Sequence, residues 1–395
     1  MPDYDIITVG GGLGGAALAK VMAEKGARVL VVEREHQFKD RIRGEFLVPW
    51  GGTEMQTLGL YDALLETCAN PQRFLDLLGS PVRDLLTTTP HKIPGLAFYH
   101  PAMQDVILNR ATGAGAEVWR GAEIRMIKAG EPPCVTVQME GAARELTARI
   151  VVCADGRSSA SRTWLGFTPH RGKQRLFGAG VMFENMRIAD DTSVFVIDSP
   201  SGRCALLFPQ GHGRVRAYLG WLQNQLPRLQ GERDFGRFVA ESISCGMPAD
   251  YFENAEAHGP LASFDLTETW VEHPYQDGVA LIGDAAGASD PTWGQGLSLT
   301  ARDVRVLAQQ LTGSNDWDAA GHAYAEAHDE YFGRSVKVGG WFFDLFFAQG
   351  PEADKSRARA MPLLAAEPER IPDHNFSGPD LPCDDAIRRR FFGEE

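Results

Sequence analysis

The sequence predicts a mixed α/β fold in which a Rossmann-like domain is interrupted by a second domain built on an antiparallel sheet. Three observations support this prediction. An apolar strand, a glycine run and a helix open the chain, and alternating strands occupy residues 175 to 222. The apolar strand Gly278 to Ile282 then precedes a glycine-rich loop and a long helix.

The first unit is a compact β-α-β arrangement. Asp5 to Val9 is a short apolar strand, and Ala16 to Glu24 has helical composition. Gly26 ends this helix, and Arg28 to Val32 forms a second strand rich in β-branched residues. Because a helix connects the two strands, we expect them to be parallel.

The rest of the chain carries further periodic segments. We expect helices at Met55 to Thr67, Met103 to Thr112, Phe235 to Ser244 and Leu297 to Leu311, and a buried helix containing Trp341 to Phe347. We expect strands at Glu117 to Trp119, Ala122 to Ile127, Val135 to Gln138, Arg149 to Cys153, Leu176 to Glu184, Ser193 to Ile197, Arg203 to Phe208 and Arg214 to Trp221.

These segments predict a discontinuous arrangement of domains. The Rossmann-like domain comprises residues 1–75, 98–170 and 275–350, and the antiparallel-sheet domain comprises residues 76–97 and 171–274. Helices close the chain, and residues 351–395 form a C-terminal tail in which the proline-rich stretch Pro368 to Pro382 lies on the surface.

Composition excludes several classes of function. Of the 395 residues, 44% are hydrophobic and 23% are charged, which is typical of a folded globular protein. The net charge of −13 argues against a nucleic-acid partner. The six cysteines are widely spaced, with no pattern typical of a zinc site or a disulfide framework. No membrane-spanning segment or signal peptide is recognisable, so we expect a cytoplasmic protein.

The glycine run carries a phosphate-binding pattern. Gly10, Gly12 and Gly15 satisfy GxGxxG between a strand and a helix, where the pattern must lie to act. Gly10 permits a tight turn, Gly12 lets a pyrophosphate approach the backbone, and Gly15 permits close helix–strand contact. The helix N-terminus then binds the anion through backbone amides, which include Leu13 and Gly14.

An acidic residue ends the second strand of this unit. Glu33 follows Gly10 by 23 residues, the position from which a carboxylate accepts hydrogen bonds from an adenosine ribose. Arg34, the next residue, belongs to the same predicted site. Together with the glycine pattern, Glu33 predicts an ADP-containing cofactor, and the glycine pattern alone does not separate NAD from FAD.

Three further segments identify a family that the chain resembles. They are Cys153-Ala154-Asp155-Gly156-Arg157-Ser158-Ser159, Gly283-Asp284-Ala285-Ala286, and Asp290-Pro291-Thr292-Trp293-Gly294-Gln295-Gly296-Leu297. In this order they resemble the DG motif, the GD motif and the proline–glycine loop of the FAD-dependent aromatic hydroxylases (group A flavoprotein monooxygenases, para-hydroxybenzoate hydroxylase-like). The resemblance covers about residues 4 to 345 and implies that the Rossmann-like domain binds FAD and the antiparallel sheet binds substrate.

The resemblance implies roles for individual residues. Asp284 would accept a hydrogen bond from a ribityl hydroxyl, and Asp155 would support FAD and the nicotinamide nucleotide. Arg43 would pair with the cofactor phosphates or shield the flavin, and Gln104 would contact the phosphate–ribityl region. A helix cap is the alternative for Asp284, a plain turn for Asp155, and a surface position for Arg43 and Gln104.

The proline–glycine loop holds the residues expected to act on the flavin itself. Gly294, Gly296 and Leu297 would present backbone amides at a helix N-terminus, where partial positive charge stabilises negative charge on the reduced flavin. Pro291 would lie near the face that reacts with oxygen. We therefore predict Pro291, Gly296 and Leu297 as the catalytic positions, with a plain loop before a helix as the alternative.

The implied reaction is a hydroxylation or epoxidation of a small aromatic substrate. NADH or NADPH would bind transiently and reduce FAD, and a flavin C4a-hydroperoxide formed with O2 would oxygenate the substrate. Two alternatives remain open: a flavin-dependent reductase of the geranylgeranyl reductase kind, and a non-catalytic FAD-binding protein. We expect the substrate between the two domains, near Trp50, Phe208, Tyr218 and Trp293, each of which could instead be a core residue.

Overall fold

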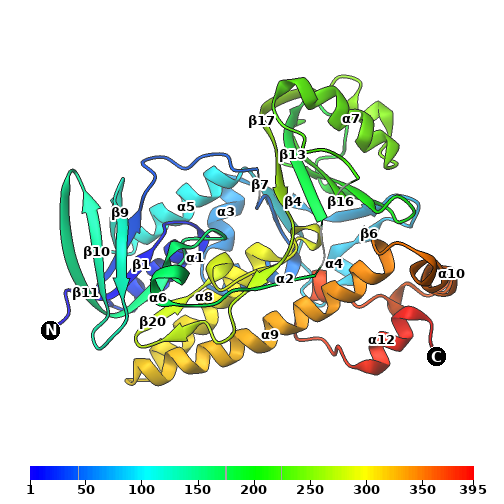
Figure 1. Cartoon of the computed structure of the whole chain (residues 1–395). Helices are drawn as coiled ribbons and strands as arrows, with labels where there is room; N and C mark the ends of the chain where they lie inside the picture. The colour runs from blue at the N-terminus through cyan, green and yellow to red at the C-terminus, as the bar shows by residue number, and fades with distance from the viewer. Residues whose placement is uncertain (43, 174–175, 224) are drawn as a thin grey trace.

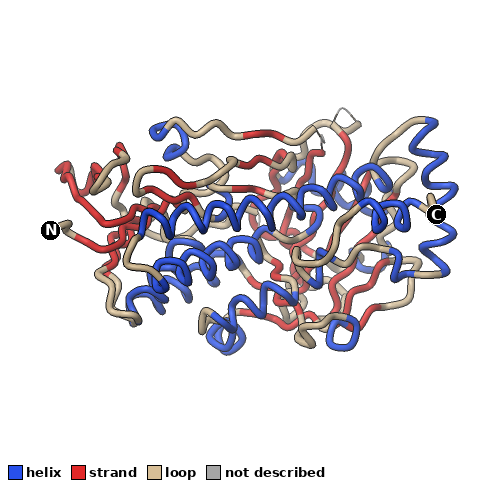
Figure 2. The backbone as a smooth tube through the Cα atoms, turned by 90° about the horizontal axis from the view of Figure 1, so that it is seen from below, coloured by secondary structure: helices blue, strands red, loops and turns tan. Residues whose placement is uncertain are grey.

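The parallel sheet lies toward one end of the molecule, and the antiparallel sheet and the C-terminal helices lie toward the other (Figure 1). The computed structural model describes residues 1–42, 44–173, 176–223 and 225–395. The N-terminus lies beside the parallel sheet, and the C-terminus lies at the opposite end, as the view from below also shows (Figure 2). The mixed α/β fold expected from the sequence, with two sheets and C-terminal helices, is confirmed.

Strand β1 (Tyr4–Val9) lies in the middle of the parallel sheet. It pairs in parallel with β2 (Val29–Glu33) on one side and with β11 (Ala142–Cys153) on the other, so that Ile7 lies opposite both Leu30 and Val151. The strand order is β19-β20-β11-β1-β2-β8, in which β8 (Glu117–Arg120) and β20 (Val279–Leu281) are parallel to their neighbours β2 and β11. The short edge strand β19 (Tyr275–Gln276) pairs antiparallel with β20.

Both faces of the parallel sheet are covered, which explains why its strands are apolar on both sides. Ile6 faces a core that includes helices α1 (Leu13–Glu24) and α5 (His100–Gly113), whereas Ile7 faces a second core. The helical layer also includes α8 (Gly296–Gly313) and α9 (Trp317–Phe346), and the other face is covered by β9 (Glu123–Lys128), β10 (Cys134–Met139) and α6 (Ala160–Leu165).

The antiparallel sheet alternates between an outer face and a face toward the parallel-sheet domain. Helix α7 (Phe235–Ser244) covers the outer face, where Phe238 contacts Phe183 with ring centroids 6.1 Å apart. The strand order is β17-β13-β16-β15-β14-β5-β6, formed by β17 (Glu256–Asp265), β13 (Leu176–Glu184), β16 (Val215–Leu222), β15 (Arg203–Pro209), β14 (Thr192–Asp198), β5 (Phe74–Leu77) and β6 (Arg83–Asp84).

The helix expected at Met55 to Thr67 is two helices. Gly59 has a φ of +66°, a left-handed conformation that ends a helix, and α3 (Tyr61–Thr67) starts two residues later. The other short elements are α2 (Pro49–Thr57), α4 (Leu85–Thr88), β3 (Phe46–Leu47), β4 (Ala69–Gln72), β7 (Gly95–Phe98), β12 (His170–Arg171), β18 (Thr269–Trp270), β21 (Gly287–Ala288), and the 3₁₀ turns Glu232–Asp234, Ala249–Phe252, Gly283–Ala285, Pro291–Trp293 and Pro368–Arg370.

Helix α9 runs along both domains (Figures 1 and 2). The apolar run expected to form a buried helix lies at its C-terminal end, where Phe342 is 3% exposed and Leu345 is fully buried. This expectation is therefore confirmed. Across the ranges that the structure describes, no helix combines the length and the hydropathy needed to cross a bilayer.

The C-terminal residues pack onto the rest of the molecule. Helices α10 (Pro351–Ala366), α11 (His374–Ser377) and α12 (Asp385–Phe392) follow α9. The expectation of a surface tail at Pro368 to Pro382 is wrong, because Asn375 accepts a hydrogen bond of 2.7 Å from Gln295 and Asp380 pairs with Arg302 at 2.8 Å. Proline content alone does not reveal these tertiary contacts. The domain boundaries stay a prediction.

Truncating Phe391 should destabilise the protein. Its fully buried ring contacts Phe342 and Phe346, with centroids 5.6 and 6.1 Å away. Because Phe391→Ala leaves a cavity, we expect a loss of about 3–5 kcal/mol in the free energy of unfolding, measured by urea denaturation. Met361→Ala on α10 is the control, since Met361 is 41% exposed and should change stability little. Equal effects of the two substitutions would contradict tight packing of the C-terminal helices.

Candidate functional site

The glycine loop between β1 and α1 has no room for side chains at two positions. Gly10 has a φ of +101°, and a Cβ there would lie 2.6 Å from the carbonyl oxygen of Ala154. A Cβ on Gly15 would lie 2.0 Å from the carbonyl oxygen of Gly10. Since both close contacts are with backbone atoms, only glycine fits, as the phosphate-binding pattern predicts.

Glu33 connects the end of β2 to this loop. Its Oε2 atom accepts a hydrogen bond of 2.7 Å from the amide of Gly11, and its Oε1 atom accepts one of 2.8 Å from the amide of Glu35. The residue is 7% exposed. The carboxylate is thus held at the strand end, as the ribose-binding prediction requires.

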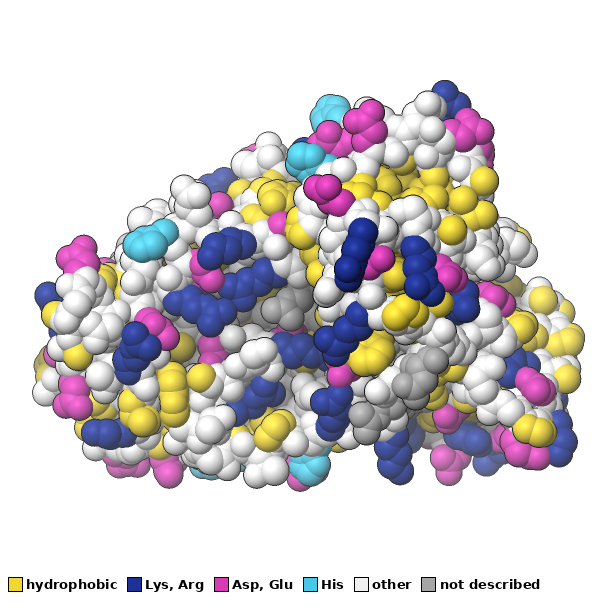
Figure 3. Space-filling model, turned by 45° about the horizontal axis from the view of Figure 1, so that its top comes forward, with side chains coloured by type: hydrophobic (Ala, Val, Ile, Leu, Met, Phe, Trp, Pro, Cys, Tyr) yellow, Lys and Arg dark blue, Asp and Glu magenta, His cyan; other side chains and the backbone are white. Residues whose placement is uncertain are grey.

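A cavity of about 620 Å³ extends from the glycine loop to the antiparallel sheet. In the space-filling view, Lys and Arg side chains surround a hollow near the middle of the face shown (Figure 3). The cavity walls bring together most of the residues predicted from the sequence: Gly10, Gly12, Leu13, Gly14, Glu33, Arg34, Gln104, Asp155, Phe208, Tyr218, Asp284, Pro291, Gly294, Gly296 and Leu297. Arg43 lies outside the described residues.

Asp284 lines the cavity from the turn Gly283–Ala285, which follows β20. A residue that the sequence analysis missed holds this turn. Asp303 on α8 accepts a hydrogen bond of 2.6 Å from the amide of Gly283 and another from the hydroxyl of Tyr331. Burial raises the pKa of Asp303 to about 6. A single Asp within the amphipathic helical stretch Leu297 to Leu311 is the signal that could have identified it.

Asp155 lines the cavity beside the start of α6. Its Oδ2 atom accepts hydrogen bonds from the amide and the hydroxyl of Ser161, at 3.1 and 2.9 Å. Arg157 also lines the cavity and donates to the carbonyl of Thr267, which connects the two domains. Both the cofactor role and the local structural role expected of this motif are compatible with this placement.

The proline–glycine loop forms another wall of the cavity. Asp290 is 8% exposed, and its carboxylate accepts a hydrogen bond of 2.9 Å from the amide of Thr292. Gly294 has a φ of +67° and lets the chain turn into α8, whose 18 residues begin at Gly296. The N-terminus of a helix of this length carries partial positive charge toward the cavity.

Two predicted substrate residues lie elsewhere. The ring of Trp293 packs on Phe342 and Phe347 of the α9 region, with centroids 5.0 and 6.0 Å away, and is absent from the cavity wall. Trp50 is 1% exposed, and its indole nitrogen donates to the carbonyl of Asn375. The structure therefore does not bring these two predicted substrate residues to the cavity, because both rings are covered by C-terminal segments that the motifs do not reveal.

A charged cluster beside Tyr218, formed by Arg216, Asp40 and Glu45, was not predicted from the sequence. Arg216 is fully buried, and its Nη2 atom donates to Asp40 at 2.6 Å. Its Nε atom lies 3.3 Å from Glu45, which lines the cavity. An arginine in register with Tyr218 on one face of an alternating strand was the available signal.

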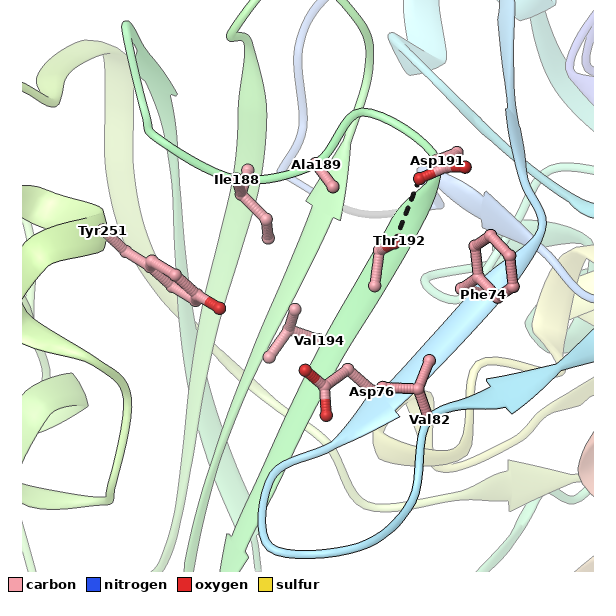
Figure 4. A pocket seen from close by; sticks show the side chains of 9 residues that line it. All are labelled: Phe74, Asp76, Val82, Ile188, Ala189, Asp191, Thr192, Val194 and Tyr251. Atoms are coloured by element: carbon pink, nitrogen blue, oxygen red, sulfur yellow. Dashed lines mark hydrogen bonds between the residues drawn. The ribbon is translucent and has the colours of Figure 1, made fainter.

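A second cavity, of about 400 Å³, lies on the antiparallel-sheet domain. Tyr251 points into it toward Val194, and Asp191 accepts a hydrogen bond of 3.1 Å from Thr192 at its rim (Figure 4). None of the residues predicted from the motifs lines this cavity. In the described part of the chain, no group of three or more His, Cys, Asp or Glu side chains is placed to hold a metal ion.

The glycine loop, the hydrogen-bonded carboxylate of Glu33 and the turn that carries Asp284 fit FAD. Comparison with known proteins agrees with this fit. A family model described as an FAD binding domain matches residues 3–338. The chain belongs to this family and is an FAD-dependent oxidoreductase. The resemblance inferred from the motifs is therefore confirmed.

The proteins to which the chain is similar have different activities. The chain is 25% identical over 358 residues to digeranylgeranylglycerophospholipid reductase 2 of Methanopyrus kandleri, covering 85% of this chain and 84% of the reductase. It is 26% identical to 6-methylpretetramide 4-monooxygenase of Streptomyces rimosus, covering 76% and 73% of the two chains. The solved p-nitrophenol 4-monooxygenase PnpA of Pseudomonas putida DLL-E4 superposes with a TM-score of 0.77 and 19% identity, over 94% of this chain and 95% of that one.

Adding one methyl group at Gly15 should abolish flavin binding or folding. The Cβ of Gly15→Ala would overlap the carbonyl oxygen of Gly10 at 2.0 Å. We expect a lower melting temperature and a loss of bound flavin absorbance in the purified protein. Gly113→Ala is the matched control, because nothing lies within 4 Å of a Cβ there and alanine favours the helix. Full flavin occupancy in Gly15→Ala would contradict the role of this contact.

The buried carboxyl of Asp290 should make stability depend on pH. Burial raises its pKa from 3.8 to about 6, so the folded state binds a proton more readily than the unfolded state. Its contribution to the free energy of unfolding is therefore present below pH 4 and is lost as pH rises to about 6. Asp290→Asn keeps an acceptor for Thr292 without the charge, and should gain up to about 3 kcal/mol over wild type between pH 4 and pH 7, measured by urea unfolding.

Asp84 supplies the control for this measurement. It caps α4 with a similar hydrogen bond, to the amide of Leu86, but it is paired with Arg73, whose hydrogen bonds lower the pKa of Asp84. Asp84→Asn should therefore lose stability relative to wild type as pH rises, the opposite direction. A pH-independent difference between Asp290→Asn and wild type would show that Asp290 is not a buried acid of raised pKa.

Proposed function

We propose that the protein is a monooxygenase that uses NADH or NADPH and O2 to hydroxylate or epoxidise a small aromatic substrate. The observation that carries this proposal is the continuity of one cavity from the FAD motifs to an aromatic wall on the antiparallel sheet. For hydroxylation, substrate, O2, NAD(P)H and one proton would give hydroxylated product, NAD(P)+ and water. Bound FAD would supply the electron transfer to O2 and the oxygen transfer to substrate.

The chain would contribute binding, orientation and exclusion of water. Phe46 stacks on Phe208 with ring centroids 4.9 Å apart, and Phe208 contacts Tyr218 at 6.0 Å. Together with Leu206 and Phe264 these rings form an apolar wall, against which a flat substrate would lie. Such a wall keeps water from a reactive oxygen species, and the monooxygenase relative supports this use of the cavity.

Residues Pro291, Gly296 and Leu297 are proposed as the catalytic positions. They line the cavity where α8 begins. Backbone amides at this helix end would stabilise negative charge on a reduced flavin, and Pro291 would limit the space above the ring. Asp284 and Glu33 would hold the ribityl and ribose hydroxyls, and Arg34 and Gln104 the phosphate region.

The electron donor would approach through the basic side of the cavity. Arg34, Lys39 and Arg41 line it, and Lys39 and Arg41 each lie 2.8 Å from the carboxylate of Glu35. Exposed cations of this kind attract a phosphate-bearing nucleotide by long-range electrostatics. NADH or NADPH would therefore bind transiently, as the resemblance implies.

A reductase of the geranylgeranyl reductase kind is the second candidate. The similarity to the Methanopyrus kandleri reductase over 84% of its length favours it. Such an enzyme would reduce an alkene and would not consume O2. A non-catalytic FAD-binding protein, the third possibility, would turn over neither NAD(P)H nor substrate.

Rapid mixing of the reduced, FAD-loaded protein with O2 distinguishes these functions. We expect a transient absorbance that belongs to neither reduced nor oxidised flavin, followed by incorporation of one atom from ¹⁸O₂ into an aromatic compound of a substrate panel. Direct reoxidation without a transient, together with anaerobic reduction of a prenyl alkene, would replace the monooxygenase with the reductase. Absence of NAD(P)H turnover with every compound would favour the non-catalytic function.

A further inference from the structure

One polar pair interrupts the aromatic wall of the cavity. Strand β16 alternates so that Arg216 and Tyr218 face the parallel-sheet domain, whereas Ala217 and Leu219 belong to the outer core under α7. The Tyr218 hydroxyl donates a hydrogen bond to Oε2 of Glu45. Both Tyr218 and Glu45 line the cavity.

A buried cation, the guanidinium of Arg216, lies beside the carboxylate of Glu45. Nε of Arg216 lies 3.3 Å from Oε1 of Glu45, while Nη2 of Arg216 bonds to Asp40. The side chains of Arg216 and Glu45 are both fully buried. Although burial disfavours its charge, the nearby carboxylates of Glu45 and Asp40 raise the pKa of Arg216. A permanently charged guanidinium therefore lies beside the Glu45 carboxylate, attracts negative charge there and fixes its position.

The direction of the hydrogen bond between Tyr218 and Glu45 determines which ligand groups this pair can bind. Burial raises the pKa of Tyr218 well above its usual value, so its hydroxyl stays protonated. Its only proton is donated to Glu45. A phenol oxygen whose proton is engaged still carries acceptor lone pairs, and the adjacent carboxylate attracts positive charge.

We propose that the Glu45–Tyr218 pair receives a hydrogen-bond-donating head group of the substrate, a hydroxyl or an amine, and rejects a carboxylate. The aromatic body of the substrate would lie along Phe46 and Phe208, whose rings adjoin the pair. A substrate carboxylate would meet the anionic Glu45 at low dielectric, which is costly. The inference rests on the proposed function for the identity of this cavity as the substrate site, and it names the substrate class.

Binding of three matched ligands tests this inference on the oxidised, FAD-loaded protein. The probes are 2-naphthalenemethanol, 2-naphthylmethylamine and 2-naphthoate, which share a ring system and differ in the head group. We expect calorimetric titration to give the alcohol and the amine at least about tenfold lower Kd values than the carboxylate. Equal or tighter binding of 2-naphthoate, or no binding of the alcohol and the amine, would overturn the inference.

Substitutions of Glu45 and Tyr218 test whether the preference for the alcohol and the amine depends on this pair. Glu45→Gln removes the anion, so the preference against 2-naphthoate should shrink to threefold or less and the amine should bind more weakly. Because Glu45→Gln also removes a partner of Arg216, Tyr218→Phe provides a variant of unchanged charge, and the alcohol should bind about fivefold more weakly to it. Retention of the wild-type preferences in both variants would overturn the inference.

Glu184→Gln is the control, because Glu184 pairs with Arg214 on the same sheet but does not line the cavity. It should keep the wild-type order of affinities. The titrations need no turnover, so they test the head-group preference separately from the monooxygenase activity. A protein that binds the probes in the expected order but never oxygenates a substrate keeps the inference and loses the proposed function.

Discussion

The contact between the start of α1 and the loop after β1 is the constraint on which the rest of the structure depends. The absence of a Cβ at Gly15 lets the helix backbone approach the carbonyl of Gly10. The helix N-terminus and the ends of β1 and β2 consequently meet at one point, where Glu33 bonds to the amide of Gly11. This junction forms one end of the cavity, and its geometry suits an anionic nucleotide.

The opposite end of the cavity depends on the register of β13, β15 and β16. Gly178 lies opposite Gly220, and Gly220 lies opposite Cys204, so small residues on three adjacent strands face the parallel-sheet domain. Tyr218 lies at the neighbouring position along the strand and carries the polar contact with Glu45. A shift of one residue in this register would turn these side chains toward α7.

Helices α8 and α9 support the flavin motifs that line the cavity. The N-terminus of α8 lines the cavity, and farther along the helix Asp303 holds the turn that carries Asp284. Tyr331 of α9 donates to the same carboxylate. The turn Gly283–Ala285, α8 and α9 are therefore joined by hydrogen bonds to the buried carboxylate of Asp303. The flavin motifs are therefore supported by residues that are distant in sequence and make no direct contribution to a motif.

The sequence by itself determined the β-α-β unit, the antiparallel sheet and the family. These features depend on local periodicity, on glycines whose conformation no other residue adopts readily, and on spacing within one strand–turn–helix segment. Leu176–Glu184 and Phe235–Ser244 were predicted with the same bounds that the structure shows. Gly10, Glu33 and Asp284 line one cavity, because β1, β2 and β20 end at the same edge of the parallel sheet.

Only the tertiary structure decided which aromatic residues face the cavity and which charges accompany them. Trp50 and Trp293 are covered by Asn375 and by the rings at the end of α9, contacts between segments too far apart in sequence for periodicity to reveal. Likewise, Glu45 and Arg216 are 171 positions apart in the sequence, yet their side chains meet at 3.3 Å. Burial and ion pairing arise from the packing of the two domains, so a local pattern specifies neither.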